Sequence, residues 1–84
     1  MKLDFKKDAF RELRDWVVID RKKAKKILDL IDDIQKHPFE GIGKPEPLKH
    51  DLSGCWSRRI DLEHRLVYRL EKDTLEIISC KYHY

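Results

Sequence analysis

The sequence predicts an α+β protein in which a two-helix antiparallel hairpin packs on a mainly antiparallel sheet. Two stretches with the apolar spacing of amphipathic helices occupy residues 7–37, and three segments with strand-like alternation lie between residues 55 and 82. A short alternating segment, residues 1–5, precedes both groups. Helices and strands segregated along the chain in this way are typical of the α+β class. The length of 84 residues predicts a single domain, residues 1–84.

Residues 1–5 form the first predicted strand, because Leu3 and Phe5 alternate with polar neighbours. A helix is expected from about Lys7, since its apolar residues recur with helical spacing. These residues are Ala9, Phe10, Leu13, Trp16 and Val17.

A second helix is expected after Asp20, whose side-chain oxygen can serve as the N-cap. Its apolar face consists of Ala24, Ile27, Leu28, Ile31 and Ile34. His37 and Pro38 end this helix, since the residue before a proline disfavours the helical conformation. The very short connection between the two helices predicts an antiparallel hairpin with one shared apolar face.

Residues 39–47 are predicted to be a loop, because four helix and strand breakers follow one another closely in them. They are Gly41, Gly43, Pro45 and Pro47. Three strands then follow, at residues 55–61, 64–71 and 74–82. Only Leu62-Glu63 and Lys72-Asp73 separate them, so the chain is expected to end in a three-stranded antiparallel meander.

Strand alternation predicts which of these residues share a face. In the middle strand, Leu66, Tyr68 and Leu70 oppose Arg65, Val67 and Arg69. In the last strand, Ile78, Cys80 and Tyr82 oppose Ile77, Ser79, Lys81 and His83. If the helices cover the apolar faces, Arg65 and His83 emerge together on the uncovered face.

Charge and cysteine usage limit the classes of function. The 19 Lys and Arg exceed the 16 Asp and Glu by only 3, so an anionic partner is indicated by clustering and not by net charge. The basic run at residues 21–26 is interpreted as a solvated helix face. Cys55 and Cys80 match no zinc spacing and make a poor disulfide framework, which favours a reducing compartment. No membrane span or signal-peptide core is apparent, so a cytoplasmic protein without membrane contact is expected.

The residues that predict chemistry gather between Gly43 and Arg69, where a proline-flanked carboxylate, two histidines and six basic residues occur together. Such a set can surround a phosphate ester with hydrogen-bond donors. Cleavage of RNA without a metal or cofactor requires a base for the 2′-hydroxyl, an acid for the leaving 5′-oxygen and fixed positive charge. Glu46 is the candidate base, Arg65 the charge clamp and His83 the acid, with Lys49 and Arg59 adding positive charge.

Other interpretations of these residues stay open at this point. A glutamate in an exposed loop, such as Glu46, is more often a solvated surface charge than a catalytic group. Arg58 and Arg59 point to opposite faces of a strand, so one of them is free to pair with Asp61 or Glu63 at the surface. His50 or His64 is an alternative acid. In a competing class of function, the basic face belongs to a non-catalytic module that binds nucleic acid or protein.

Three sequence blocks carry a resemblance to a known family. They are HPFEGIGKPEPLKHDLSGCWSRRID at residues 37–61, EHRLVY at residues 63–68 and KYHY at residues 81–84. At these blocks the chain resembles the YoeB family of toxins, within the RelE-like superfamily, and the resemblance extends over essentially the whole chain. It implies a RelE-like fold.

The resemblance further implies a ribosome-dependent endoribonuclease, an mRNA interferase that cuts mRNA in the ribosomal A site and inhibits translation. It implies a cognate antitoxin of the YefM type, a homodimer, and repression of the operator DNA by the toxin-antitoxin complex. By resemblance, the general base falls on Glu46, the phosphate-stabilising arginine on Arg65 and the general acid on His83. Lys49, Arg59 and Tyr84 match positions that bind or orient RNA.

Overall fold

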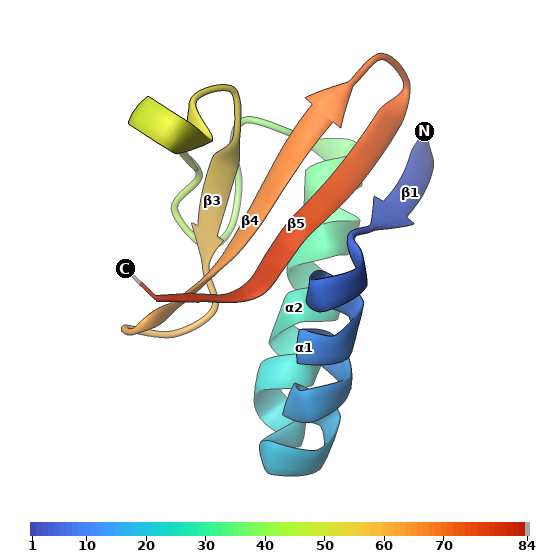
Figure 1. The fold of residues 1–84 in the computed structure, drawn as a ribbon, viewed down its shortest axis with the longest axis vertical. Helices are drawn as coiled ribbons and strands as arrows, with labels where there is room; N and C mark the ends of the chain where they lie inside the picture. Colours follow the sequence, from blue (N-terminus) through green and yellow to red (C-terminus); the bar gives the residue numbers. More distant parts are fainter. Residues whose placement is uncertain (84) are drawn as a thin grey trace.

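The computed structural model describes residues 1–83 and shows two helices on one face of a five-stranded sheet (Figure 1). The elements in chain order are β1 (Lys2–Phe5), α1 (Lys7–Ile19), α2 (Arg21–Lys36), β2 (Glu46–Pro47), the 3₁₀ turn η1 (His50–Leu52), β3 (Trp56–Arg59), β4 (His64–Glu71) and β5 (Thr74–His83). The strand order is β1-β5-β4-β3-β2, and β1 alone is parallel to its neighbour. The predicted α+β architecture is confirmed. Tyr84, a predicted RNA-binding residue, lies outside the described residues.

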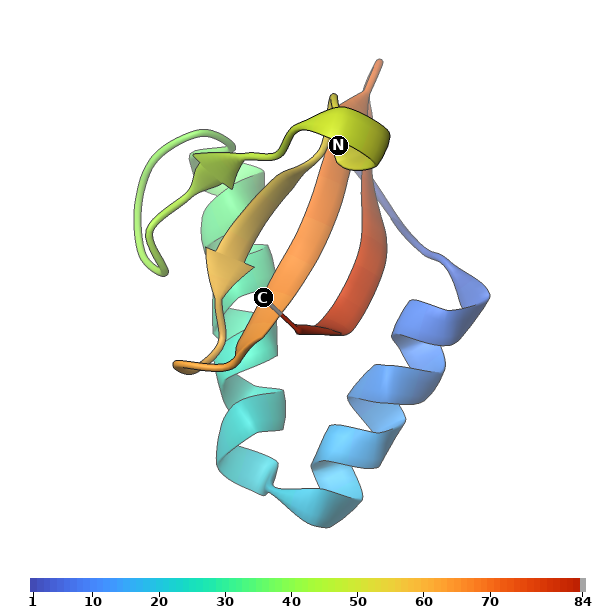
Figure 2. The same cartoon turned by 60° about the vertical axis from the view of Figure 1, so that its left-hand side comes forward.

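The helical hairpin forms where the sequence predicted it (Figure 2). The carboxylate of Asp20 accepts a hydrogen bond from the backbone N–H of Lys22 at 3.1 Å, as an N-cap does. The N–H of Asp20 itself donates to the carbonyl of Trp16 at 2.8 Å, which closes the first helix. The second helix ends at Lys36, and the N–H of its C-cap residue His37 donates to the backbone carbonyl of Asp33. Asp20 is therefore both the C-cap of α1 and the N-cap of α2.

The core lies between this hairpin and the covered face of the sheet. Its buried members are Ala9, Trp16, Ala24, Ile27, Leu30, Ile31, Ile34, Ile60, Leu66, Tyr68, Leu75, Ile77 and Cys80. Phe10, Val17 and Leu28 were predicted to face the core but are about half-exposed. The apolar stripes of the helices are thus wider than the area that the sheet covers. None of the helices in the described chain is long and apolar enough to cross a membrane.

The last strand is bulged, which overturns the predicted faces. Tyr68 pairs with Ile77 and Val67 with Ser79, whereas Arg65 pairs with Tyr82. Between these pairs β5 therefore contains two more residues than β4, one at each of two β-bulges. The extra residues change which side chains point inward, so Ile77 and Cys80, predicted on opposite faces, both reach the core.

Two connections also differ from expectation. Glu46 and Pro47, predicted within a loop, form the short edge strand β2 and pair with Ser57 and Trp56. An edge strand tolerates proline because one side of it needs no ladder hydrogen bond. β3 ends at Arg59, so residues 60–63 make the turn to β4 instead of residues 62–63 alone. The Lys72-Asp73 hairpin is confirmed, with a backbone φ of 55° at Lys72.

Candidate active site

Strand register gathers the predicted charged residues on the face of the sheet opposite the helices. Glu46 lies across from Ser57 on β3, and Arg59 lies across from Arg65 on β4. Directly opposed residues share a face, and alternate residues of one strand do so too. Glu46, Ser57, Arg59 and Arg65 therefore lie on one surface, although they come from three strands.

Glu46 and Arg65 form the centre of this surface. A terminal nitrogen of Arg65, Nη1, donates to Oε1 of Glu46 at 2.9 Å and to Oγ of Ser57 at 3.0 Å. The Arg65 side chain is only 5% exposed, while that of Glu46 is 47% exposed. A guanidinium stays protonated in proteins, so a fixed positive charge lies beneath an accessible carboxylate.

A cleft of about 350 Å³ opens beside this pair. Glu46, Lys49 and His50 line it together with Tyr82 and the apolar side chains of Pro47, Leu48 and Leu52. The turn η1 fixes the backbone of Lys49 and His50 in the cleft lining. The N–H of Leu52 donates to the carbonyl of Lys49, and the N–H of Ser53 donates to the carbonyl of His50. The structure thus brings Lys49 to Glu46, as the sequence predicted.

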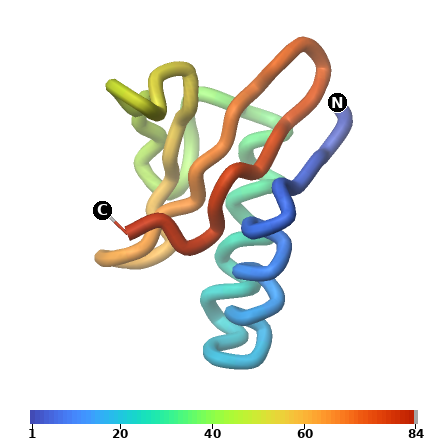
Figure 3. Tube along the Cα trace, in the orientation of Figure 1, coloured from blue at the N-terminus to red at the C-terminus, as the bar shows by residue number. Residues whose placement is uncertain are grey.

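His83 is placed differently from the prediction. The register puts Tyr82, and not His83, directly across from Arg65, and sets His83 across from His64. Nε2 of His83 lies 3.7 Å from the Glu63 carboxylate, and its ring centroid lies 6.0 Å from that of His64. Figure 3 shows the end of β5 passing beside the turn between β3 and β4. The bulges of β5 cause this difference, because each advances the strand by one residue.

His64 is held on the helix side of the sheet. Its ring lies 5.1 Å from the Trp16 ring, and its Nδ1 lies 3.1 Å from both oxygens of Asp61. Burial alone would raise the pKa of Asp61, but hydrogen bonds from the His64 ring and from the backbone N–H groups of His64 and Glu63 outweigh it and lower this pKa to about 2. His64 is therefore tied into the fold, whereas His50, the other alternative acid, lines the cleft.

Arg58 has a structural role that sequence reasoning missed. Its side chain is fully buried and pairs with Asp33, not with Asp61 or Glu63 as the sequence suggested. It also donates to the backbone carbonyls of His37, Glu40 and Ile42. The hydrogen bond from Arg58 is the main cause of a lowered pKa at Asp33.

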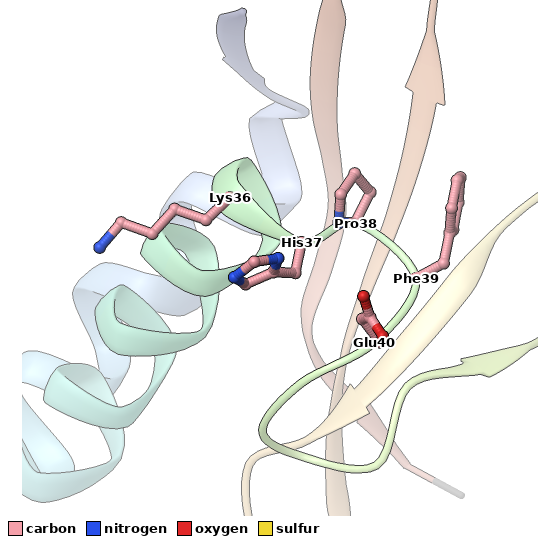
Figure 4. Close-up of a pocket in the computed structure, with 5 residues that line it drawn as sticks. All are labelled: Lys36, His37, Pro38, Phe39 and Glu40. Atoms are coloured by element: carbon pink, nitrogen blue, oxygen red, sulfur yellow. The ribbon is translucent and has the colours of Figure 1, made fainter.

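These bonds fix the segment that leads from α2 to Glu46. Figure 4 shows its first part, where Pro38, Phe39 and Glu40 follow His37 and line a second cleft of about 310 Å³. Phe39 packs on Trp56 with ring centroids 4.8 Å apart, and the N–H of Arg59 donates to the carbonyl of Gly43. The loop is thereby attached to β3 on both sides of Arg58. Within residues 1–83, His, Cys, Asp and Glu side chains form no group of three or more that is arranged to hold a metal ion.

Comparison with known proteins adds the family. A sequence model described as "YoeB-like toxin of bacterial type II toxin-antitoxin system" matches residues 5–84. The chain is 52% identical to Toxin YoeB of Escherichia coli K12 over the full length of both proteins. The solved YoeB/ParE toxin from Agrobacterium tumefaciens superposes with a TM-score of 0.95 at 45% identity, with 100% of both chains covered.

A Staphylococcus aureus protein extends the comparison. Its structure as a YoeB dimer matches with a TM-score of 0.92, and its heterotetrameric YoeB-YefM toxin-antitoxin complex matches with a TM-score of 0.90. Both are 45% identical and cover 100% of this chain and 98% of theirs. These likenesses confirm the RelE-like α+β fold. The chain belongs to the YoeB-like toxins of bacterial type II toxin-antitoxin systems.

Proposed function

We propose that this toxin is a ribosome-dependent endoribonuclease that cuts mRNA in the ribosomal A site by metal-independent general acid-base catalysis, and so inhibits translation. The ion pair between the accessible Glu46 and the buried Arg65, beside a cleft that contains Lys49, is the observation that carries the proposal. A base next to fixed positive charge is what attack of a 2′-hydroxyl on its own phosphodiester requires.

Each residue then has a defined step. Glu46 takes the proton of the 2′-hydroxyl while the 2′-oxygen attacks phosphorus, and the leaving 5′-oxygen receives a proton from the acid. Arg65, Lys49 and Arg59 stabilise the negative charge that develops on the phosphate. A phosphate at Arg65 competes with Glu46 for the guanidinium, so substrate binding releases the carboxylate for its role as base.

The acid is assigned to His83, with His50 as the alternative that the cleft itself offers. His83 is 70% exposed and lies at the end of β5, so its side chain is accessible to a substrate. His50 already lines the cleft beside Glu46. An imidazole can carry a transferable proton in either position.

The proposal includes partners. The S. aureus relative has been solved as a dimer and in a YoeB-YefM complex, which supports a homodimer and a YefM-like antitoxin for this chain. We further propose that the ribosome and mRNA are its targets and that the complex with antitoxin binds operator DNA. The ribosome supplies what the isolated cleft does not, because it holds the 2′-hydroxyl in line with phosphorus.

The test is primer extension on mRNA bound to ribosomes, with the same mRNA free in solution. Wild type, Glu46→Gln and Glu71→Gln are compared, since Glu71 is an exposed glutamate at the far end of β4. Discrete A-site cuts are expected with wild type and with Glu71→Gln. Glu46→Gln is expected to cut about 10²- to 10⁴-fold more slowly while it still binds, and free mRNA is expected to be cut weakly.

His83→Gln and His50→Gln decide between the two acids in the same assay. The variant that loses cleavage identifies the group, provided that its thermal unfolding matches wild type. If folded wild type without antitoxin makes no cuts on ribosomes, the catalytic proposal fails. A protein that binds RNA equally well with Glu46→Gln but never cuts it is instead a binding module.

A further inference from the structure

The cleft beside Glu46 is lined by Tyr82, an aromatic side chain to which the proposed chemistry gives no role. We propose that Tyr82, together with His50, forms a subsite that stacks on a nucleobase next to the scissile phosphate. This inference rests on the proposed nuclease function and specifies how its substrate is held.

Tyr82 is placed by the bulged register of β5. It lies directly across from Arg65, so its side chain shares the face on which Arg65 meets Glu46. It lines the same cleft as Glu46 and Lys49 and remains 36% exposed. An aromatic ring that is held by a strand and still open to solvent is a suitable stacking platform.

His50 lines the same cleft as Tyr82, and its backbone conformation is unusual. Its φ is 57°, in the left-handed region that residues other than glycine seldom adopt. The turn η1 enforces this conformation, through the bonds that Leu52 and Ser53 donate to the carbonyls of Lys49 and His50. Such strain clusters at functional sites, where the surrounding structure maintains it.

The rest of the lining divides into a charged and an apolar part. Glu46 and Lys49 supply charge, while Pro47, Leu48 and Leu52 supply apolar surface. A nucleotide has the same division, with a phosphate at one end and a flat base at the other. Placing the phosphate at Arg65 and Lys49 leaves the base within the part of the cleft that Tyr82 and His50 line.

The test combines substitutions of Tyr82 with removal of single bases from the RNA. The probe is an mRNA bound to ribosomes, with a 2′-deoxy nucleotide at the cut position so that the nucleophile is missing. It is made with all bases present, or with one abasic nucleotide on the 5′ or the 3′ side of the scissile phosphate. Dissociation constants are measured for wild type, Tyr82→Leu and Tyr82→Phe.

Wild type is expected to bind one of the abasic probes about tenfold more weakly than the intact probe. Tyr82→Leu is expected to bind the intact probe about tenfold more weakly and to lose almost nothing further on the abasic one. Tyr82→Phe keeps the ring and is expected to behave as wild type. His50→Asn, which tolerates the positive φ, is expected to show the same coupling if Tyr82→Leu does not fold.

The subsite is overturned if Tyr82→Leu and the abasic nucleotide weaken binding independently, so that their effects on the dissociation constant multiply at both abasic positions. It is also overturned if wild type does not bind the intact probe. Cleavage of unmodified mRNA is scored separately, so the two proposals fail distinguishably. Cuts without coupling eliminate the subsite and leave the nuclease. Coupling without cuts eliminates the nuclease and leaves a base-binding cleft.

Discussion

Replacing Arg58 with Lys is expected to destabilise the fold although the charge is kept. The Arg58 side chain donates five hydrogen bonds, to the Asp33 carboxylate, the Tyr68 hydroxyl and three backbone carbonyls. A lysine ammonium has only three donors, so at least two of these five hydrogen bonds are lost. An unsatisfied buried group costs about 1–3 kcal/mol, so a loss of about 2–6 kcal/mol is expected.

Urea unfolding followed by tryptophan fluorescence measures this loss, since Trp16 and Trp56 report on the core and on β3. For a domain of this size, about 2 kcal/mol also lowers Tm by roughly 8–16 °C. Arg59→Lys is the matched control, because Arg59 is the next residue of β3 and lies on the opposite face. It is expected to change stability by less than about 0.5 kcal/mol. If Arg58→Lys loses no more than this control, Arg58 does not anchor the loop.

Three further predictions concern other buried or constrained groups. Asp61→Asn keeps an acceptor oxygen but removes the charge. Because the folded pKa is lowered from 3.8 to about 2, that charge contributes about 2 kcal/mol above pH 4, and the contribution is lost as the pH falls toward 2. Urea unfolding at pH 6 and pH 2.5 tests this, and an equal wild-type advantage at both pH values would contradict it. Gly41→Ala should destabilise more than Gly54→Ala, since both have positive φ but only at Gly41 does a Cβ collide with the Asp33 carboxylate. Thermal unfolding compares them, and equal losses would show that the clash is relieved. The Cys80 thiol, whose pKa burial raises to about 12, should resist iodoacetamide at pH 8 until the protein unfolds, and labelling of native protein at a free-thiol rate would refute this.

Local sequence signals were sufficient for the helices and the last hairpin. Apolar spacing located α1 and α2, Asp20 marked their junction, and Pro38 marked where α2 ends. These features depend on residues only a few positions apart, so the sequence displays both partners together. The proximity of Lys49 to Glu46 was predictable for the same reason, because both residues lie in one short segment.

Features that depend on distant partners were not predictable. Arg58 and Asp33 are 25 residues apart, and nothing near either one specifies the pairing. The bulges of β5 leave no mark in its alternation, yet they decide that Tyr82 and not His83 lies opposite Arg65. β2 was missed because an isolated Glu-Pro pair has no strand signal until β3 lies beside it.

The position of β5 between β1 and β4 has a consequence for the timing of synthesis. β5 is made after every other element, yet β1 has no other strand to pair with, and the core lacks Leu75, Ile77 and Cys80 until β5 emerges. Domains whose contacts join distant parts of the chain close late in folding. A ribosome that stops before Thr74 therefore releases a fragment without a complete sheet or cleft.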